Sequence, residues 1–115
     1  MEIITEYAGS DGRLAHLLLE DESLDGLVIA GVGLGHVSDG TLEAIRDIRA
    51  KGIPVVLSSR VPTGRIVPLY AVDFETRNLG CIDADNLSPQ KARILLMLAM
   101  TRTRDPAELQ EFFDR

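Results

Sequence analysis

The chain contains no tryptophan, two tyrosines and three phenylalanines, so its core must be built from aliphatic side chains. Its single cysteine, Cys81, excludes an internal disulfide and is compatible with a reducing compartment. With 115 residues, 45% of them hydrophobic, the chain is long enough for one domain with its own core. We therefore predict a single domain over residues 1–115 that is held together by aliphatic packing.

Clusters of basic residues and long apolar runs are also missing. The net charge is −6, and no group of lysines and arginines is large enough to neutralise several phosphates, so we predict no nucleic-acid and no membrane partner. No apolar run reaches the roughly 18 residues of a membrane span, and the start lacks the pattern of a signal peptide. The prediction is a cytoplasmic location, or a periplasmic one if a signal peptide precedes a missing upstream domain.

Strand-like and helix-like segments alternate along the chain. The run from Gly26 to Ala30 is continuously apolar, as expected of a strand covered on both faces. Helix starts are marked by Ser38 or Asp39, and by Ser88 followed by Pro89. The alternation predicts an α/β domain, a small three-layer α/β/α (Rossmann- or flavodoxin-like) parallel sheet of about four strands with about four helices. The predicted strands are residues 2–7, 26–30, 53–58 and 79–82, and the predicted helices run from Ser10 or Asp11 to 20, and over 38–51, 88–101 and 106–113, the last capped by Asp105.

Apolar residues at helical spacing identify the faces that turn toward the sheet. The pattern places four side chains of the third helix in the core and three of the second against the sheet. The first helix repeats leucines at the same spacing. These residues are Leu95, Leu96, Leu98 and Met100 of the third helix, Leu42, Ile45 and Ile48 of the second, and Leu14, Leu17 and Leu18 of the first.

Ligands of parallel sheets bind at the carboxyl ends of the strands, which predicts a site near residues 31–37 and 58–64. The glycine-rich segment 31–36 departs from the dinucleotide pattern, so glycines in a tight turn are favoured over a nucleotide site. Ser58 and Ser59 lack a nearby base and a Gly-x-Ser-x-Gly elbow, which argues against serine catalysis. The acidic residues Asp73, Glu75, Asp83 and Asp85 match no calcium loop. We predict neither a metal nor a cofactor.

Three segments carry a resemblance to a known family. They are Leu-Ser-Pro-Gln-Lys-Ala-Arg-Ile-Leu-Leu-Met-Leu over 87–98, Val-Leu-Ser-Ser-Arg-Val-Pro-Thr-Gly over 56–64, and Thr-Arg-Thr-Arg-Asp-Pro over 101–106. With them the chain resembles the C-terminal domain of bacterial asparaginases and glutaminase-asparaginases, from about residue 2 to the end. The resemblance implies hydrolysis of a side-chain amide of asparagine or glutamine to an acid and ammonia. It also implies that the threonine nucleophile and its supporting Thr–Asp–Lys group belong to an N-terminal domain missing from this chain.

The resemblance further implies residues that reach a neighbouring subunit's active site. Many asparaginases have Gly-Asn-Gly-Asn in the loop after the second strand, where this chain has Leu34 and His36 in place of the asparagines. His36 is the substrate-side candidate there, together with Gly35 and Ser38. A family glutamate aligns with Ala71, so Asp73 or Glu75 is the candidate to replace it. These departures put asparagine specificity in question and leave the fold expectation intact.

Contact residues and partners follow from the same resemblance. Ser59 and Arg60 match a structural and subunit-contact loop, with Arg60 expected to form an ion pair. Lys91 and Arg93 lie in the first turns of a helix, where cations are unfavourable, and this predicts that they pair with a specific acceptor in an internal salt bridge. The implied partners are the asparaginase N-terminal domain, a second copy in a dimer or tetramer, and a small amino-acid amide substrate. The alternative is a stand-alone, non-catalytic dimerisation or small-ligand-binding module, and the isolated chain is expected to be inactive.

Overall fold

Four parallel strands form one sheet in the computed structural model, which describes residues 1–5, 12–31, 38–59, 76, 78–84 and 87–114. Helices cover both of its faces, so the predicted three-layer α/β/α architecture is confirmed. The elements are, in chain order, β1 (Glu2–Thr5), α1 (Arg13–Leu18), β2 (Leu27–Gly31), α2 (Asp39–Ala50), β3 (Val55–Ser59), β4 (Ile82–Asp83), α4 (Pro89–Ala99) and α5 (Pro106–Phe113).

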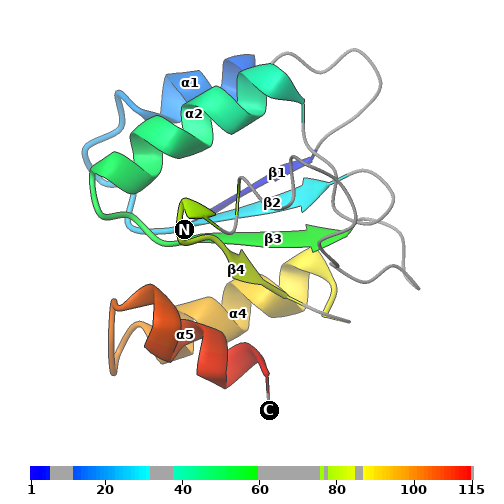
Figure 1. Ribbon diagram of the computed structural model, residues 1–115, viewed down its shortest axis with the longest axis vertical. Helices are drawn as coiled ribbons and strands as arrows, with labels where there is room; N and C mark the ends of the chain where they lie inside the picture. Colours follow the sequence, from blue (N-terminus) through cyan, green and yellow to red (C-terminus); the bar gives the residue numbers. More distant parts are fainter. Residues whose placement is uncertain (6–11, 32–37, 60–75, 77, 85–86, 115) are drawn as a thin grey trace.

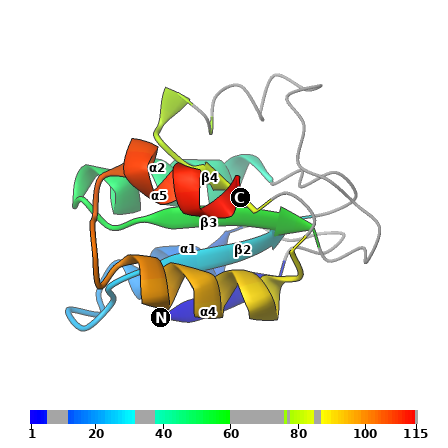
Figure 2. The same ribbon diagram turned by 90° about the horizontal axis from the view of Figure 1, so that it is seen from below.

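Figure 1 shows α1 and α2 on one side of the sheet and α4 and α5 on the other, and Figure 2 shows the same layers from below. The strands are hydrogen-bonded in the order β1-β2-β3-β4, which is also their order in the chain. Because successive crossovers of one hand advance in one direction, α1 and α2 fall on the same face. Among the described helices, α4 and α5, which follow β4 in the chain, cover the other face. The described sheet thus lacks the reversal of strand order at which open α/β sheets form their ligand crevice.

The alternation of side chains along the strands divides the core into two clusters. Leu27 and Ile29 of β2 and Leu57 of β3 face α1 and α2, whereas Val28 and Val56 face α4 and α5. All five side chains are at most 1% exposed, as the continuous apolar run in β2 predicted. The predicted inward face of α2 is confirmed, because its three apolar positions join the first cluster: Leu42, Ile45 and Ile48.

Three helices begin where the sequence predicted. Ser38 Oγ accepts a hydrogen bond from the Thr41 backbone N–H at 3.2 Å, and Ser88 Oγ accepts one from the Lys91 N–H at 3.3 Å. In the same way, Asp105 caps α5, whose bounds are those predicted. Each cap satisfies a backbone donor that has no partner within its helix. Local sequence signals therefore determine these three helix starts.

The prediction for the first helix was wrong at both ends. The helix begins at Arg13, after Gly12 with φ of 79°, and no side chain caps it. A Cβ on Gly12 would lie 2.4 Å from the Gly40 carbonyl carbon, so only glycine allows α1 and α2 to approach this closely. The helix ends at Leu18, and two of its leucines, Leu14 and Leu17, are exposed.

Two other predictions need correction. Leu98 was expected in the core but is 63% exposed, because it lies on the outer side of α4, whose inner side carries Ala92, Leu96 and Ala99. Leu95 and Met100 are partly buried against the same cluster. The fourth strand was expected over residues 79–82, yet β4 pairs with β3 only at Ile82–Asp83.

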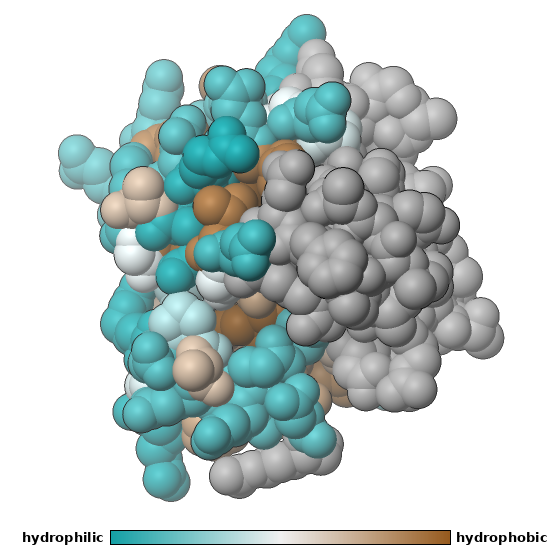
Figure 3. Space-filling model, in the orientation of Figure 1, coloured by the Kyte–Doolittle hydropathy of each residue, from teal (hydrophilic) through white to brown (hydrophobic). Residues whose placement is uncertain are grey.

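Hydrophilic side chains predominate on the face of the molecule shown in Figure 3, and hydrophobic ones gather in small areas between the upper and lower helices. These areas lie at the level of the sheet in the matching view of Figure 1. The aliphatic core is thus enclosed between the helical layers on the part of this face that the structure describes.

Candidate functional site

Parallel strands bring the carboxyl ends of β2, β3 and β4 to one edge of the sheet. Gly31 pairs with Ser59 at the ends of β2 and β3, and Leu57 pairs with Asp83 at the end of β4. The start of α2 at Ser38 belongs to the same edge, because α2 runs from there back to the start of β3. This edge is the candidate site, and it is the one that the sequence predicted.

Ser58 occupies the centre of this edge and is fully buried. Its hydroxyl donates to the Leu87 carbonyl at 2.9 Å, and next to it the Ala84 N–H donates to the Leu57 carbonyl at 2.9 Å. These two bonds hold the connection between β4 and α4 against β3. The hydroxyl proton of Ser58 is therefore engaged by a carbonyl, which has no ability to act as a general base. For Ser58 this geometry supports the sequence argument against a nucleophile, whereas the side chain of Ser59 lies outside the described part of the structure.

The end of β4 is fixed by a side chain that sequence reasoning missed. The Asp83 N–H donates to Gln110 Oε1 at 2.8 Å, and Gln110 Nε2 donates to the Asp83 carbonyl at 3.1 Å and to Asp114 Oδ1 at 3.0 Å. The amide of Gln110 thus bonds both backbone groups of one strand residue. The sequence could not reveal this bond, because the two residues are 27 positions apart. The one available signal was that Gln110 follows the buried Leu109 in α5.

Most of the predicted substrate-side residues lie outside the described residues: Gly35, His36, Asp73 and Glu75, and with them the contact residue Arg60. Ser59 is described only as a strand position, paired with Gly31. Ser38 is described, and its Oγ also donates to the Thr41 hydroxyl at 3.0 Å. In this arrangement Ser38 serves the start of α2. Its assignment to the substrate side stays a prediction.

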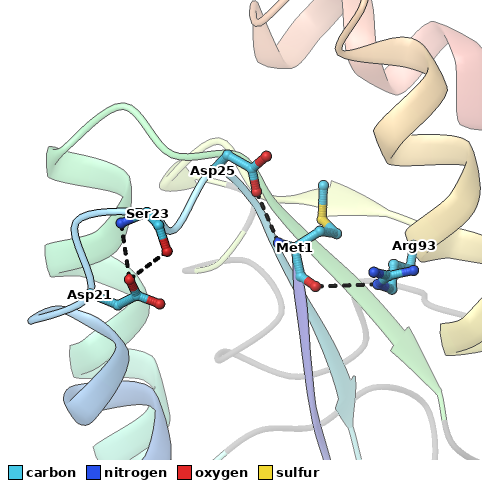
Figure 4. Close-up of polar contacts among 5 residues, drawn as sticks. All are labelled: Met1, Asp21, Ser23, Asp25 and Arg93. Carbon is cyan, nitrogen blue, oxygen red and sulfur yellow. Dashed lines mark hydrogen bonds and ion pairs between the residues drawn. The ribbon is translucent and has the colours of Figure 1, made fainter.

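The internal salt bridge expected for Lys91 and Arg93 is absent from the contacts of the described residues. Arg93 Nε instead donates to the Met1 carbonyl at 3.2 Å, as Figure 4 shows. Lys91 is exposed on the first turn of α4. The ion pair found in the described part of the chain joins the Met1 amino group to Asp25 Oδ1 at 3.0 Å. Arg93 thus has the specific acceptor that its position implied, but this acceptor is a carbonyl group.

Three titrating groups with shifted pKa values lie away from the carboxyl edge. The hydrogen bond from the Met1 amino group lowers the pKa of Asp25, and hydrogen bonds from the Ser23 hydroxyl and N–H lower the pKa of Asp21 (Figure 4). Burial raises the pKa of the Cys81 thiol to about 12. Asp21 and Asp25 precede β2 and Cys81 precedes β4, so all three lie toward the amino ends of the strands. None of them qualifies as an acid or base for chemistry at the candidate site.

The described residues bring no three histidine, cysteine, aspartate or glutamate side chains together as metal ligands. They also include no helix that is both long and apolar enough to cross a bilayer. What the described edge offers is a rigid support: three strand ends and the start of α2, held by backbone pairing, by Ser58 and by Gln110. Such a support can position loops.

Comparison with known proteins identifies the family of this domain. The model of the glutaminase/asparaginase C-terminal domain matches residues 1–113. The chain belongs to this family. L-asparaginase 2 of Escherichia coli (strain K12) is 38% identical over 113 residues, which is 98% of this chain and 32% of that protein. A crystal structure of a probable cytoplasmic L-asparaginase from Campylobacter jejuni aligns with a TM-score of 0.86 at 38% identity, covering 99% of this chain and 36% of the other.

The family extends beyond asparaginases. A glutamyl-tRNA(Gln) amidotransferase polypeptide of Thermofilum pendens is 30% identical over 112 residues, 96% of this chain and 25% of that polypeptide. The chain therefore spans about a third or less of the length of these relatives. The match is to the C-terminal domain of the family, which confirms the resemblance found in the sequence.

Proposed function

We propose that this domain completes the active site of an asparaginase-type amidohydrolase, which cleaves the side-chain amide of asparagine or glutamine to an acid and ammonia. The nucleophilic threonine comes from an N-terminal asparaginase domain. This domain contributes packing, contacts between subunits and the side chains at the carboxyl edge. The observation that carries the proposal is the match over residues 1–113 to L-asparaginases that are about three times longer.

The geometry of the carboxyl edge supports this division of roles. Ser58 donates a hydrogen bond to the Leu87 carbonyl, and a carbonyl group does not act as a general base. Acyl transfer needs a nucleophile within hydrogen-bond reach of a base. Since Ser58 lacks such a base, we assign the nucleophile to the N-terminal domain of the family. His36, with Gly35 and Ser38, is our candidate for contact with the substrate, and Asp73 or Glu75 is the candidate for its amino group.

The proposal is tested with two proteins, the 115-residue chain alone and a chimera in which it replaces the C-terminal domain of E. coli L-asparaginase 2. We expect no ammonia release from asparagine or glutamine by the chain alone, and measurable release by the chimera. Turnover by the chain alone that survives repurification would contradict the division of roles. A folded chimera without activity would favour the alternative, a stand-alone dimerisation or ligand-binding module.

The role of His36 is tested in the same chimera. If its side chain contacts the substrate, His36→Ala lowers kcat/KM, while the amount of folded protein stays the same. The matched control is His16→Ala, which changes the other histidine of the chain, on α1. An unchanged kcat/KM for His36→Ala removes this residue from the site.

We propose a cytoplasmic location for the complete protein. The structural relative from C. jejuni carries the word cytoplasmic in its name, whereas an asparaginase of Haemophilus influenzae, 38% identical over 112 residues, is named periplasmic. The single cysteine is compatible with a reducing compartment. Fractionation of cells that express the natural gene, followed by immunodetection, distinguishes the two compartments.

A further inference from the structure

The outer side of α4 carries three large apolar side chains that nothing in the described structure covers. Ile94 is 56% exposed, Met97 44% and Leu98 63%. Their spacing of three and four residues places them next to one another on the helix surface. The opposite side of α4 packs on the sheet through Ala92, Leu96 and Ala99, so the helix is apolar on both sides. We name the three exposed residues the α4 stripe.

A helix that faces water ordinarily carries polar residues on its outer side. Apolar side chains gathered on a surface mark an interaction site more often than scattered ones do. The α4 stripe therefore indicates that another polypeptide surface packs here. Its identity follows from where the rest of the chain of the relatives enters.

The start of the domain lies against α4. Arg93 donates to the Met1 carbonyl, and the Met1 side chain approaches Gly26 together with Leu96. Figure 2 shows the N-terminus beside α4. Arg93 lies four residues before Met97, so the contact with Met1 borders the α4 stripe. In relatives for which this is the C-terminal third, the remaining two thirds join the domain at this point.

We infer that the α4 stripe is the surface on which the N-terminal asparaginase domain of the same polypeptide packs, an inference that rests on the function proposed above. The occupant is the segment that ends beside α4, and it has an apolar face. Its rim is expected to carry carboxylates, because exposed cations flank the stripe at Lys91 before it and at Arg102 and Arg104 after it.

A second copy of this domain fits the α4 stripe less well. Two α4 helices related by a twofold axis would bring Lys91 of one copy close to Arg102 of the other, and like charges in contact are unfavourable. Stable interfaces between proteins also bury roughly 800 Å² on each partner, more than three side chains provide. A neighbouring domain joined through the chain needs less area, because the tether raises its effective concentration.

Met97 provides a test with unmodified protein. Hydrogen peroxide converts exposed methionine to the sulfoxide. Met97 and Met100 share the tryptic peptide 94–102, and its fragmentation by tandem mass spectrometry reports the rate at each site. We expect Met97 to oxidise readily in the 115-residue chain and at least fivefold more slowly in the chimera with the N-terminal domain of E. coli L-asparaginase 2. Met100, which is partly buried in the described structure, is the internal reference. Equal rates for Met97 in both proteins would overturn the inference.

Substitution of the α4 stripe tests the same contact. Ile94→Glu/Leu98→Glu in the chimera is compared with Leu14→Glu/Leu17→Glu, a control at two α1 leucines that are 57% and 58% exposed. We expect the α4 variant to lose at least tenfold in ammonia release and to melt in two transitions, while the α1 control behaves like the parent chimera. If both variants keep the parent activity and a single transition, the inference fails while the proposed function stands.

Two further outcomes have defined meanings. A parent chimera that is folded but inactive counts against the proposed function, and the oxidation of Met97 then still reports whether the α4 stripe is covered. Sedimentation of the 115-residue chain at several concentrations tests the rival occupant. A dimer in which Met97 is protected, and which Leu98→Glu dissociates, would overturn the inference in favour of a second copy.

Discussion

The helices α2 and α4 lie on opposite faces of the same sheet and begin in the same way, yet their outer sides differ. Each starts at a serine cap and buries one apolar side against the strands. The outer side of α2 is charged, with Asp39, Glu43, Arg46 and Asp47 exposed. The outer side of α4 carries Ile94, Met97 and Leu98 instead.

The comparison distinguishes two roles of a helical surface, packing on the sheet and facing outward from the domain. The inner sides of both helices follow from the need to cover the sheet, and the charged outer side of α2 is typical of a helix that faces water. The outer side of α4 departs from that pattern between Ile94 and Leu98, a little more than one turn. The fold of this domain accounts for α2 completely, whereas α4 needs a neighbour outside the domain.

The largest expected effect is the loss of stability when a buried side chain is removed from the inner side of α2 or of α4. The size of the two losses tests whether both inner sides contribute equally to the core. Ile45→Ala in α2 and Leu96→Ala in α4 each remove a fully buried side chain, so each should lower the free energy of unfolding by about 2–5 kcal/mol. Urea unfolding followed by circular dichroism measures both. The control is Leu98→Ala, for which we expect a change within about 0.5 kcal/mol because the site is exposed. A loss at Leu98 equal to that at Leu96 would mean that the α4 stripe packs within this domain.

A smaller effect is expected at the two serine caps. Ser88→Ala removes one acceptor and should cost about 1 kcal/mol. Ser38→Ala should cost more, because Ser38 also donates to the hydroxyl of Thr41, which is buried and loses a partner. Thermal and urea unfolding measure the difference, with Ser88→Asp and Ser38→Asp as variants that retain an acceptor. An equal or smaller loss at Ser38 would contradict the description of that cap.

The smallest effect at neutral pH concerns Cys81, which packs in the cluster below α2. Burial raises the pKa of its thiol from 9.0 to about 12 in the folded chain. Well below pH 9 the thiol is protonated in both states and its ionisation does not affect stability. As the pH rises from about 9 toward 12, the unfolded chain releases this proton while the folded chain retains it, so this group's contribution to stability falls.

Iodoacetamide labelling at pH 8 reports the same burial. We expect slow alkylation of Cys81 in the folded chain and rapid alkylation in urea, since the thiolate is the reacting form. The thiol of Leu57→Ala, which opens the same cluster, should be labelled faster than that of the parent. Labelling of the native parent at the rate seen in urea would show that the thiol is accessible.

The parts of the fold that sequence predicted are those set by local chemistry. Ser38, Ser88 and Asp105 cap helices through bonds to residues three positions later, so their effect is readable from the sequence. The apolar run of β2 likewise reports burial on both faces. The start of α1 was missed because it depends on the approach of Gly12 to Gly40, a contact between two helices.

Leu98 shows the limit of periodicity. An apolar residue that will meet another domain has the same pattern as one that meets the sheet, so the sequence placed Leu98 in the core. For the candidate site, the sequence predicted the carboxyl edge and argued against Ser58 as a nucleophile, and the bond from Ser58 to the Leu87 carbonyl supports that argument. It could not find Gln110, whose importance depends on a bond to Asp83 across 27 residues.

Gln110 has a consequence for how this sheet associates with other chains. An edge strand offers unpaired N–H and carbonyl groups to any extended peptide. At β4 the amide of Gln110 occupies both groups of Asp83, as an added strand would otherwise do. A fifth strand is thereby blocked at this position, so the glutamine side chain contributes to protection of β4 against edge-to-edge aggregation.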